Sequence, residues 1–170
     1  MPLLIILIVL LIVAGIILKL LKETTSQYMR DSLCDKLDDI PLQRHRLLST
    51  AELSFYQVLR SILPENLAIS CKCRLEDFIH VENCPQKEAF RARIRSRHVD
   101  FVVYNPQNGY TCYAIELDDS SHQSERQKES DQFKDAVFRK VGMPLIRIPA
   151  QRTYQPAEIA QIINAAISHV

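Results

Sequence analysis

Acidic side chains follow one apolar stretch of the chain, in the segment YAIELDDSSHQ from Tyr113 to Gln123. The apolar and aromatic residues before Glu116 predict a buried strand, and Asp118 and His122 come directly after it. Because side chains alternate along a strand, Glu116 and Asp118 point to the same side, about 7 Å apart. Either these residues only form the turn that ends a strand, or they supply oxygen ligands to a cation.

A third carboxylate, Asp100, opens the preceding predicted strand, VDFVVYN. A hairpin centred near Gln107 brings Asp100 opposite the Glu116 end of the return strand. Three carboxylates so close raise one another's pKa, and a divalent cation relieves the repulsion. We therefore expect Mg²⁺ or Mn²⁺ at Asp100, Glu116 and Asp118. Such a metal polarises a phosphodiester and activates a water. His122 is then a general acid or base, or it supports a metal ligand through a hydrogen bond.

Basic residues accompany these carboxylates. The segment CPQKEAFRARIRSRH reads as a basic connector that leads directly to Asp100. It is either a solvated loop or, beside a metal site, a surface for a polyanion. The candidate nucleic-acid-binding residues are Arg91, Arg93, Arg95, Arg97, Lys134 and Arg147. Lys134 belongs to a polar helix face, whereas Arg147 interrupts an apolar strand and is expected to pair with a carboxylate or a phosphate.

The elements that position these residues follow from periodicity and from stop signals. Ser49 and Glu52 form a capping box for a helix, STAELSFYQVLRSIL, so Glu52 is either a cap alone or also a site residue. Three strands follow, then a helix that ends at Gly142, a short strand, MPLIRIPA, and a last helix from Pro156. The order α-β-β-β-α-β-α predicts an α/β domain with a mixed sheet flanked by helices.

The five cysteines predict no disulfide framework, because their number is odd. Cys71, Cys73 and Cys84, with His80, are candidate zinc ligands, although C-x-C is not a usual zinc spacing. The alternative is that they are small buried side chains, with Cys71 and Cys73 on one face of a strand.

The first residues form an appendage of a different kind. Residues 3 to 18 (LLIILIVLLIVAGIIL) are uninterrupted apolar sequence, about the length that crosses the hydrocarbon layer of a membrane. Basic residues flank only the C-terminal side, which predicts a cytoplasmic C-terminal part. We expect a transmembrane anchor at residues 1–21, a juxtamembrane linker at residues 22–46 and one domain at residues 47–170. The net charge of +1 means that the chain as a whole has no strong positive field, the feature that would by itself indicate a nucleic-acid partner.

Four segments together, LLSTAELSFYQVL, VDFVVYN, AIELDDSSH and SDQFKDAVFRKVGMPLIRI, resemble a bacterial domain of unknown function, family 2726. That family is placed in the PD-(D/E)XK nuclease superfamily, near the very-short-patch-repair-like endonucleases. The resemblance implies a restriction-endonuclease-like mixed sheet with an αβββαβ core. It matches Asp100 to the motif aspartate, Glu116 to the acidic residue and Glu52 to a glutamate of the first helix. Asp118 stands where the superfamily usually has lysine. Either His122 or Lys134 takes the role of that lysine, or no residue does.

These expectations define a membrane-anchored nuclease-like protein at the inner membrane, with its C-terminal domain in the cytoplasm. It would hydrolyse phosphodiester bonds of a nucleic acid, DNA in the first place, with Mg²⁺ or Mn²⁺. One alternative is a catalytically inactive module of the same fold that binds nucleic acid or a protein partner at the membrane. A second is an interaction domain stabilised by zinc.

Overall fold

The computed structural model describes residues 2–34, 40–118 and 125–168. His122, the predicted general acid or base, lies outside the described residues. The chain divides into two compact units, Met1–His45 and Arg46–Val170. The candidate site residues that the structure describes all belong to the second unit.

The first unit contains one long helix, α1 (Pro2–Cys34), so the apolar run and the polar residues after it belong to the same element. Within the described residues, no helix combines the length and the apolar character needed to cross a membrane. The transmembrane helix predicted at residues 1–21 is therefore not supported by the structure.

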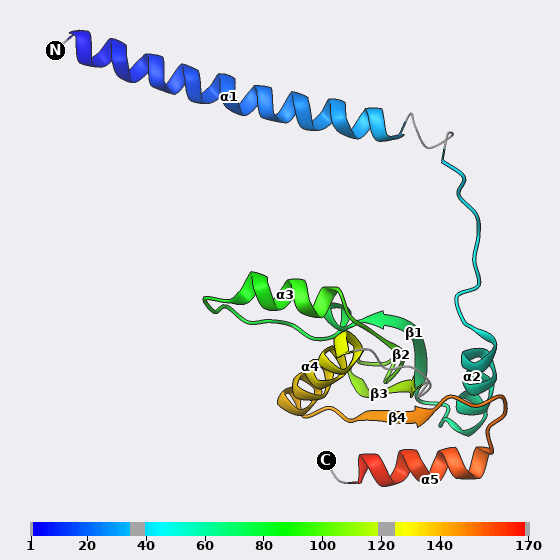
Figure 1. Ribbon diagram of the computed structural model, residues 1–170. Helices are drawn as coiled ribbons and strands as arrows, with labels where there is room; N and C mark the ends of the chain where they lie inside the picture. The colour runs from blue at the N-terminus through cyan, green and yellow to red at the C-terminus, as the bar shows by residue number, and fades with distance from the viewer. Residues whose placement is uncertain (1, 35–39, 119–124, 169–170) are drawn as a thin grey trace. The chain divides into compact units, whose positions relative to one another are not determined.

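The second unit is a mixed four-stranded sheet with helices on both faces (Figure 1). Its elements are α2 (Thr50–Ile62), β1 (Ala68–Arg74), the 3-10 turn η2 (Leu75–Asp77), α3 (Lys87–Arg95), β2 (His98–Tyr104), β3 (Thr111–Asp118), α4 (Glu125–Val141), β4 (Leu145–Pro149) and α5 (Pro156–Ile167). The strands lie in sequence order, with antiparallel β1–β2 and β2–β3 pairs and a parallel β3–β4 pair. The predicted α/β class and the order of the predicted elements are confirmed.

One element was missed by the sequence, because the predicted basic connector is the helix α3. Its buried residue, Ile94, is only 2% exposed and packs into a cluster with Leu75 and Phe138. A single apolar anchor among many charged residues gives little periodic signal, so the helix depends on tertiary packing more than on its own pattern.

Each face of the sheet has its own core. Helices α2 and α5 cover one face, and the buried side chains there are Phe55, Leu59, Phe101, Val103, Tyr113, Ile115, Ile146, Ile148, Tyr154, Ile159 and Ile163. The turn η2 and the helices α3 and α4 contribute to the smaller core of the other face, which contains Leu75, Ile79, Ile94, Val99, Val102, Ala114 and Phe138. The sheet is thus the middle layer of three.

Helix α2 begins as its sequence predicts. The Ser49 amide donates to Glu52 Oε2 over 2.7 Å, and the Glu52 amide donates to Ser49 Oγ over 3.3 Å. These reciprocal bonds confirm the capping box and fix the direction of the Glu52 side chain.

The alternation of side chains along β1 is interrupted at Lys72, whose φ of 56° lies in the left-handed region. Cys71 packs against the core under α2 and α5, whereas Cys73 packs against the opposite core. The prediction that these two cysteines share one face is wrong, because alternation holds only for extended backbone. A left-handed conformation costs a non-glycine residue about 1–2 kcal/mol, so the surrounding structure must hold Lys72 in place.

We expect Lys72→Gly to be more stable than Lys72→Ala by about 0.5–1 kcal/mol. Both variants lose the ammonium group, so their ion pairs are equally lost. Only alanine pays the free energy of a left-handed backbone, and this cost exceeds the additional conformational entropy that glycine loses on folding. Urea unfolding of the two full-length variants, followed by circular dichroism, measures the difference. An alanine variant as stable as the glycine variant would show that the backbone relaxes and that no strain is held at this position.

Candidate functional site

Strands β2 and β3 bring Asp100 beside Glu116, as the predicted hairpin requires. The register pairs Phe101 with Ile115, so the next residues outward are Asp100 and Glu116. Asp100 Oδ2 accepts a hydrogen bond of 2.9 Å from the amide of Leu117. The predicted meeting of these two carboxylates is confirmed.

Glu116 is the buried acid of the site, with 6% of its surface exposed. Lys134 of α4 donates to Glu116 Oε1, and Arg147 Nη1 of β4 lies 3.0 Å from Oε2. Oε2 receives no hydrogen bond from any residue that the structure describes. Burial raises the pKa of Glu116, while Lys134 and Arg147 act in the opposite direction.

Arg147 contacts carboxylates, one of the two partners predicted for it. It reaches the site because β4 pairs in parallel with β3 and places Arg147 opposite Glu116. Its guanidinium lies 3.1 Å from Asp118, 3.1 Å from Asp135 and 3.5 Å from Asp131. The planar fork of arginine suits this simultaneous contact with several carboxylates.

Lys72 is a residue of the site that the sequence did not reveal. Its Nζ donates to Glu52 Oε1 over 2.5 Å and to Asp100 Oδ1 over 2.7 Å. The capping role predicted for Glu52 is confirmed by one carboxylate oxygen, and the other oxygen accepts from Lys72. The only signal was a lysine between two cysteines in the middle of a predicted strand.

The ion pairs of Lys72 shift two pKa values in the expected directions. Burial would raise the pKa of Glu52, but hydrogen bonds from Lys72 and from the Ser49 amide outweigh it and the pKa is lowered. Burial would likewise lower the pKa of Lys72, but the hydrogen bonds to Asp100 and Glu52 raise it. Both groups are therefore held in their charged forms.

A polar pocket of about 130 Å³ lies between these groups. It is lined by Asp100, Glu116, Leu117, Asp118, Gln127, Asp131 and Lys134. Within the described residues, no three His, Cys, Asp or Glu side chains are grouped closely enough to hold a metal ion. Each of these carboxylates contacts Lys72, Lys134 or Arg147, so the predicted grouping of three carboxylates around a metal is not seen among the described residues, although they line one pocket.

Among the described residues of the site, acidic side chains outnumber basic ones. The bases Lys72, Lys134 and Arg147 form ion pairs with six acids: Glu52, Asp100, Glu116, Asp118, Asp131 and Asp135. Lys128 borders Asp118, Asp131 and Asp135 as well, so its charge offsets part of this excess. Mg²⁺ needs only one or two protein carboxylates and keeps several waters, and the carboxylates that line the polar pocket are Asp100, Glu116, Asp118 and Asp131.

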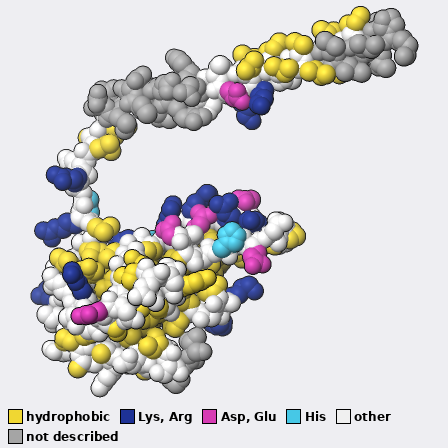
Figure 2. Space-filling view, turned by 180° about the vertical axis from the view of Figure 1, so that it is seen from behind, with side chains coloured by type: hydrophobic (Ala, Val, Ile, Leu, Met, Phe, Trp, Pro, Cys, Tyr) yellow, Lys and Arg dark blue, Asp and Glu magenta, His cyan; other side chains and the backbone are white. Residues whose placement is uncertain are grey.

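The predicted arginines of α3 and its C-terminal end have separate environments. Arg91 forms salt bridges with Glu76 at 2.8 Å and with Glu88 at 3.4 Å. Arg93 and Arg97 lie over the ring of Phe133, at 3.9 and 4.6 Å from its centre. Arg95 is exposed. Figure 2 shows that many basic side chains on the face it draws lie beside acidic ones.

The candidate zinc ligands are also dispersed. Cys71 and Cys73 pack into opposite cores, and Cys84 is exposed and reduced. The part of the chain that the structure describes therefore supports the reading of Cys71 and Cys73 as small, partly buried side chains.

Comparison with known proteins gives one match. A family model described as "Protein of unknown function (DUF2726)" matches residues 44–167, which include every described residue of the site. No curated protein and no solved structure matches the chain significantly.

We expect Glu52→Gln and Glu116→Gln to change the pH dependence of stability in opposite ways. Folding lowers the pKa of Glu52, so its ionised form stabilises the folded state. That stabilisation is complete above the ordinary pKa of 4.5 and is lost as the pH falls through the pKa of the folded state. Folding raises the pKa of Glu116, so its contribution to stability is complete below pH 4.5 and is lost as the pH rises through the pKa of the folded state.

Unfolding of both variants in urea, with EDTA and across pH 3 to 8, measures these contributions. Glu52→Gln should cost about 1–2 kcal/mol at neutral pH and progressively less toward acid pH. The free energy of unfolding of Glu116→Gln should increase relative to that of the wild type as the pH rises. Parallel profiles for the two variants would contradict the assignment.

Proposed function

We propose that this chain, which belongs to the family described as protein of unknown function (DUF2726), hydrolyses phosphodiester bonds of a nucleic acid with the help of a divalent metal ion. The observation that carries the proposal is the buried carboxylate of Glu116 beside Asp100 and Lys134 on one polar pocket. An acid that is buried at a cost in free energy, next to a like charge and a lysine, is typical of functional sites.

Asp100 and Glu116 are the residues that would hold the metal, with Asp118 at the rim of the same pocket. When bound there, Mg²⁺ or Mn²⁺ would polarise the phosphodiester and lower the pKa of a water. Arg147 keeps the carboxylate of Glu116 in place from the β4 side, since it lies against Oε2. The orientation of Glu116 therefore does not depend on the metal.

Lys134 would take the part that the PD-(D/E)XK superfamily gives to the lysine of its motif. In this chain Asp118 occupies that motif position, but Lys134 reaches Glu116 from α4 and borders the pocket. An ammonium group there can orient a water or stabilise negative charge that develops on the phosphate. This placement supports the assignment of the chain to that superfamily, because α4 supplies here the positive charge that the motif position of Asp118 lacks.

The arginines of α3 would contact the phosphate backbone outside the pocket. Arg95 is exposed, and the stacked pair of Arg93 and Arg97 presents two guanidinium groups on one aromatic ring. Contacts of this kind position a nucleic acid without reading its sequence.

A second function fits the same ion pairs. Lys72, Lys134 and Arg147 already contact the carboxylates of the site, as they would in a nuclease fold that has lost its catalysis. Such a module would bind nucleic acid or a protein partner without cutting. A requirement for metal distinguishes the two functions, because phosphate contacts alone need no Mg²⁺ and are only weakened by it, as by any added salt.

Cleavage by the full-length chain tests the proposal. Labelled single- and double-stranded DNA and RNA are incubated with Mg²⁺, with Mn²⁺ or with EDTA. Cutting should require metal and should fall at least about 100-fold in Glu116→Gln and in Lys134→Met. Glu158→Gln, which removes an exposed carboxylate of α5, is the matched control and should cut as the wild type does. No cutting by folded wild type with either metal would favour the binding module.

Location at the inner membrane, with the second unit in the cytoplasm, remains a proposal. It is supported by the apolar side chains of α1, among which Ile6, Leu10 and Leu18 are more than half exposed. We expect the full chain in the membrane fraction of lysed cells and a chain without residues 1–21 in the soluble fraction. If both chains divide equally between the membrane and soluble fractions, the proposed location is contradicted.

A further inference from the structure

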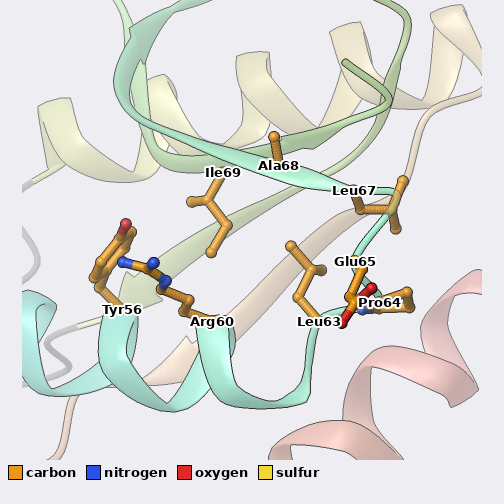
Figure 3. Close-up of a pocket in the computed structure, with 8 residues that line it drawn as sticks. All are labelled: Tyr56, Arg60, Leu63, Pro64, Glu65, Leu67, Ala68 and Ile69. Carbon is orange, nitrogen blue, oxygen red and sulfur yellow. The ribbon is translucent and has the colours of Figure 1, made fainter. Parts of the chain in front are cut away.

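A second pocket, separate from the acidic one, lies between the C-terminal half of α2 and the beginning of β1 (Figure 3). Its volume is about 360 Å³, within the range of clefts that hold small organic groups. The lining residues are Tyr56, Arg60, Leu63, Pro64, Glu65, Leu67, Ala68 and Ile69. Aromatic, aliphatic and charged side chains thus meet in one place.

Tyr56 provides a flat ring that is already held in position. Its ring stacks on Phe101 with 6.5 Å between the ring centres and 26° between the planes, and Phe101 is fully buried. In Figure 3 the side chains of Tyr56 and Arg60 rise from α2 toward β1, and Ile69 points back toward them. A ring fixed by the core loses little entropy when a second planar group stacks near it.

Arg60 provides positive charge to the pocket, which Glu65 also lines, and it is held in no salt bridge among the described residues. Its side chain is exposed. Lys72, Lys134, Arg91 and Arg147 all contact acids, in contrast to Arg60. An arginine in this state next to an aromatic ring suits an anionic ligand that also carries a planar group.

The pocket and Glu52, which reaches the acidic site through Lys72, lie along one face of α2. Glu52, Tyr56 and Arg60 follow one another at intervals of four residues, and residues so spaced lie on the same side of a helix. The axial distance from Glu52 to Arg60 is about 12 Å, and Glu52 contacts Asp100 through Lys72. Three or four stacked nucleotides, at about 3.4 Å each, cover the same length.

From these features we infer that the pocket between α2 and β1 holds an unpaired nucleobase of the nucleic acid that the acidic site acts on. The base stacks at Tyr56, and the adjoining phosphate contacts Arg60. The substrate is accordingly a single strand or a strand with an unpaired base close to the bond to be cut, since a paired base has no free face or edge to enter a pocket. The inference rests on the proposed function for the identity of the ligand as a nucleic acid.

Binding of a fluorescent eight-nucleotide single strand to the full-length chain in EDTA tests the inference apart from cleavage. Tyr56→Leu should weaken binding about five- to a hundredfold, and Tyr56→Phe should keep it, because stacking needs the ring and not the hydroxyl. Arg60→Gln should weaken binding and reduce the salt slope by about 1. Arg139→Gln, an equal loss of charge at an exposed residue of α4, is the control.

Two further readouts make the result specific. The wild type should bind the single strand more tightly than the same sequence as a duplex, and Tyr56→Leu should lose that preference. A strand with one abasic position should bind the wild type less well. The inference is overturned if Tyr56→Leu and Arg60→Gln, both folded by circular dichroism, bind like the Arg139→Gln control.

The binding and cleavage results separate the inference from the proposed function. Cleavage by the wild type together with unchanged binding of Tyr56→Leu overturns the inference alone. Loss of binding in Tyr56→Leu, with no cleavage under any metal, supports the pocket and leaves the chain as a binding module.

Discussion

The burial of one carboxylate, that of Glu116, determines much of the architecture around the sheet. A charge with 6% exposure is tolerated only when cations accompany it, and Lys134 and Arg147 provide them. Both cations come from the chain that follows β3: α4 carries the lysine and β4 carries the arginine. The parallel crossover from β3 to β4 is therefore needed for the site as well as for the core, because without it Glu116 would be an uncompensated buried charge.

A second set of ion pairs, those of Lys72, joins the site to α2. Lys72 joins Glu52 of α2 to Asp100 of β2 and does so from a left-handed backbone conformation. The folded environment shifts the two glutamates of the site in opposite directions: the pKa of Glu52 is lowered and the pKa of Glu116 is raised. Pairs of carboxyl groups whose environments push their pKa values apart are the usual basis for a division between acid and base.

The sequence predicted what depends on local pattern and missed what depends on distant partners. The capping box at Ser49, the end of α4 before Gly142 and the meeting of Asp100 with Glu116 all follow from short-range signals. Lys72 was missed because its acidic partners lie 20 and 28 residues away in sequence. The helix α3 was missed because Ile94 is its one buried residue. Spacing places carboxylates near one another, but it does not reveal which cation each one faces.

The kinds of cation at the site indicate how its tasks are divided. Arg147 contacts four carboxylates from β3 and α4, and its rigid fork suits the maintenance of a fixed frame. Lys72 and Lys134 each contact two carboxylates through a single ammonium on a flexible stem, so their charge can move while the frame stays in place. In the hydrolysis that we propose, the mobile positive charge that stabilises the phosphate would come from these two lysines. Helix α2 connects this chemistry to the second pocket, because Glu52 and Tyr56 are one turn apart on the same rigid element.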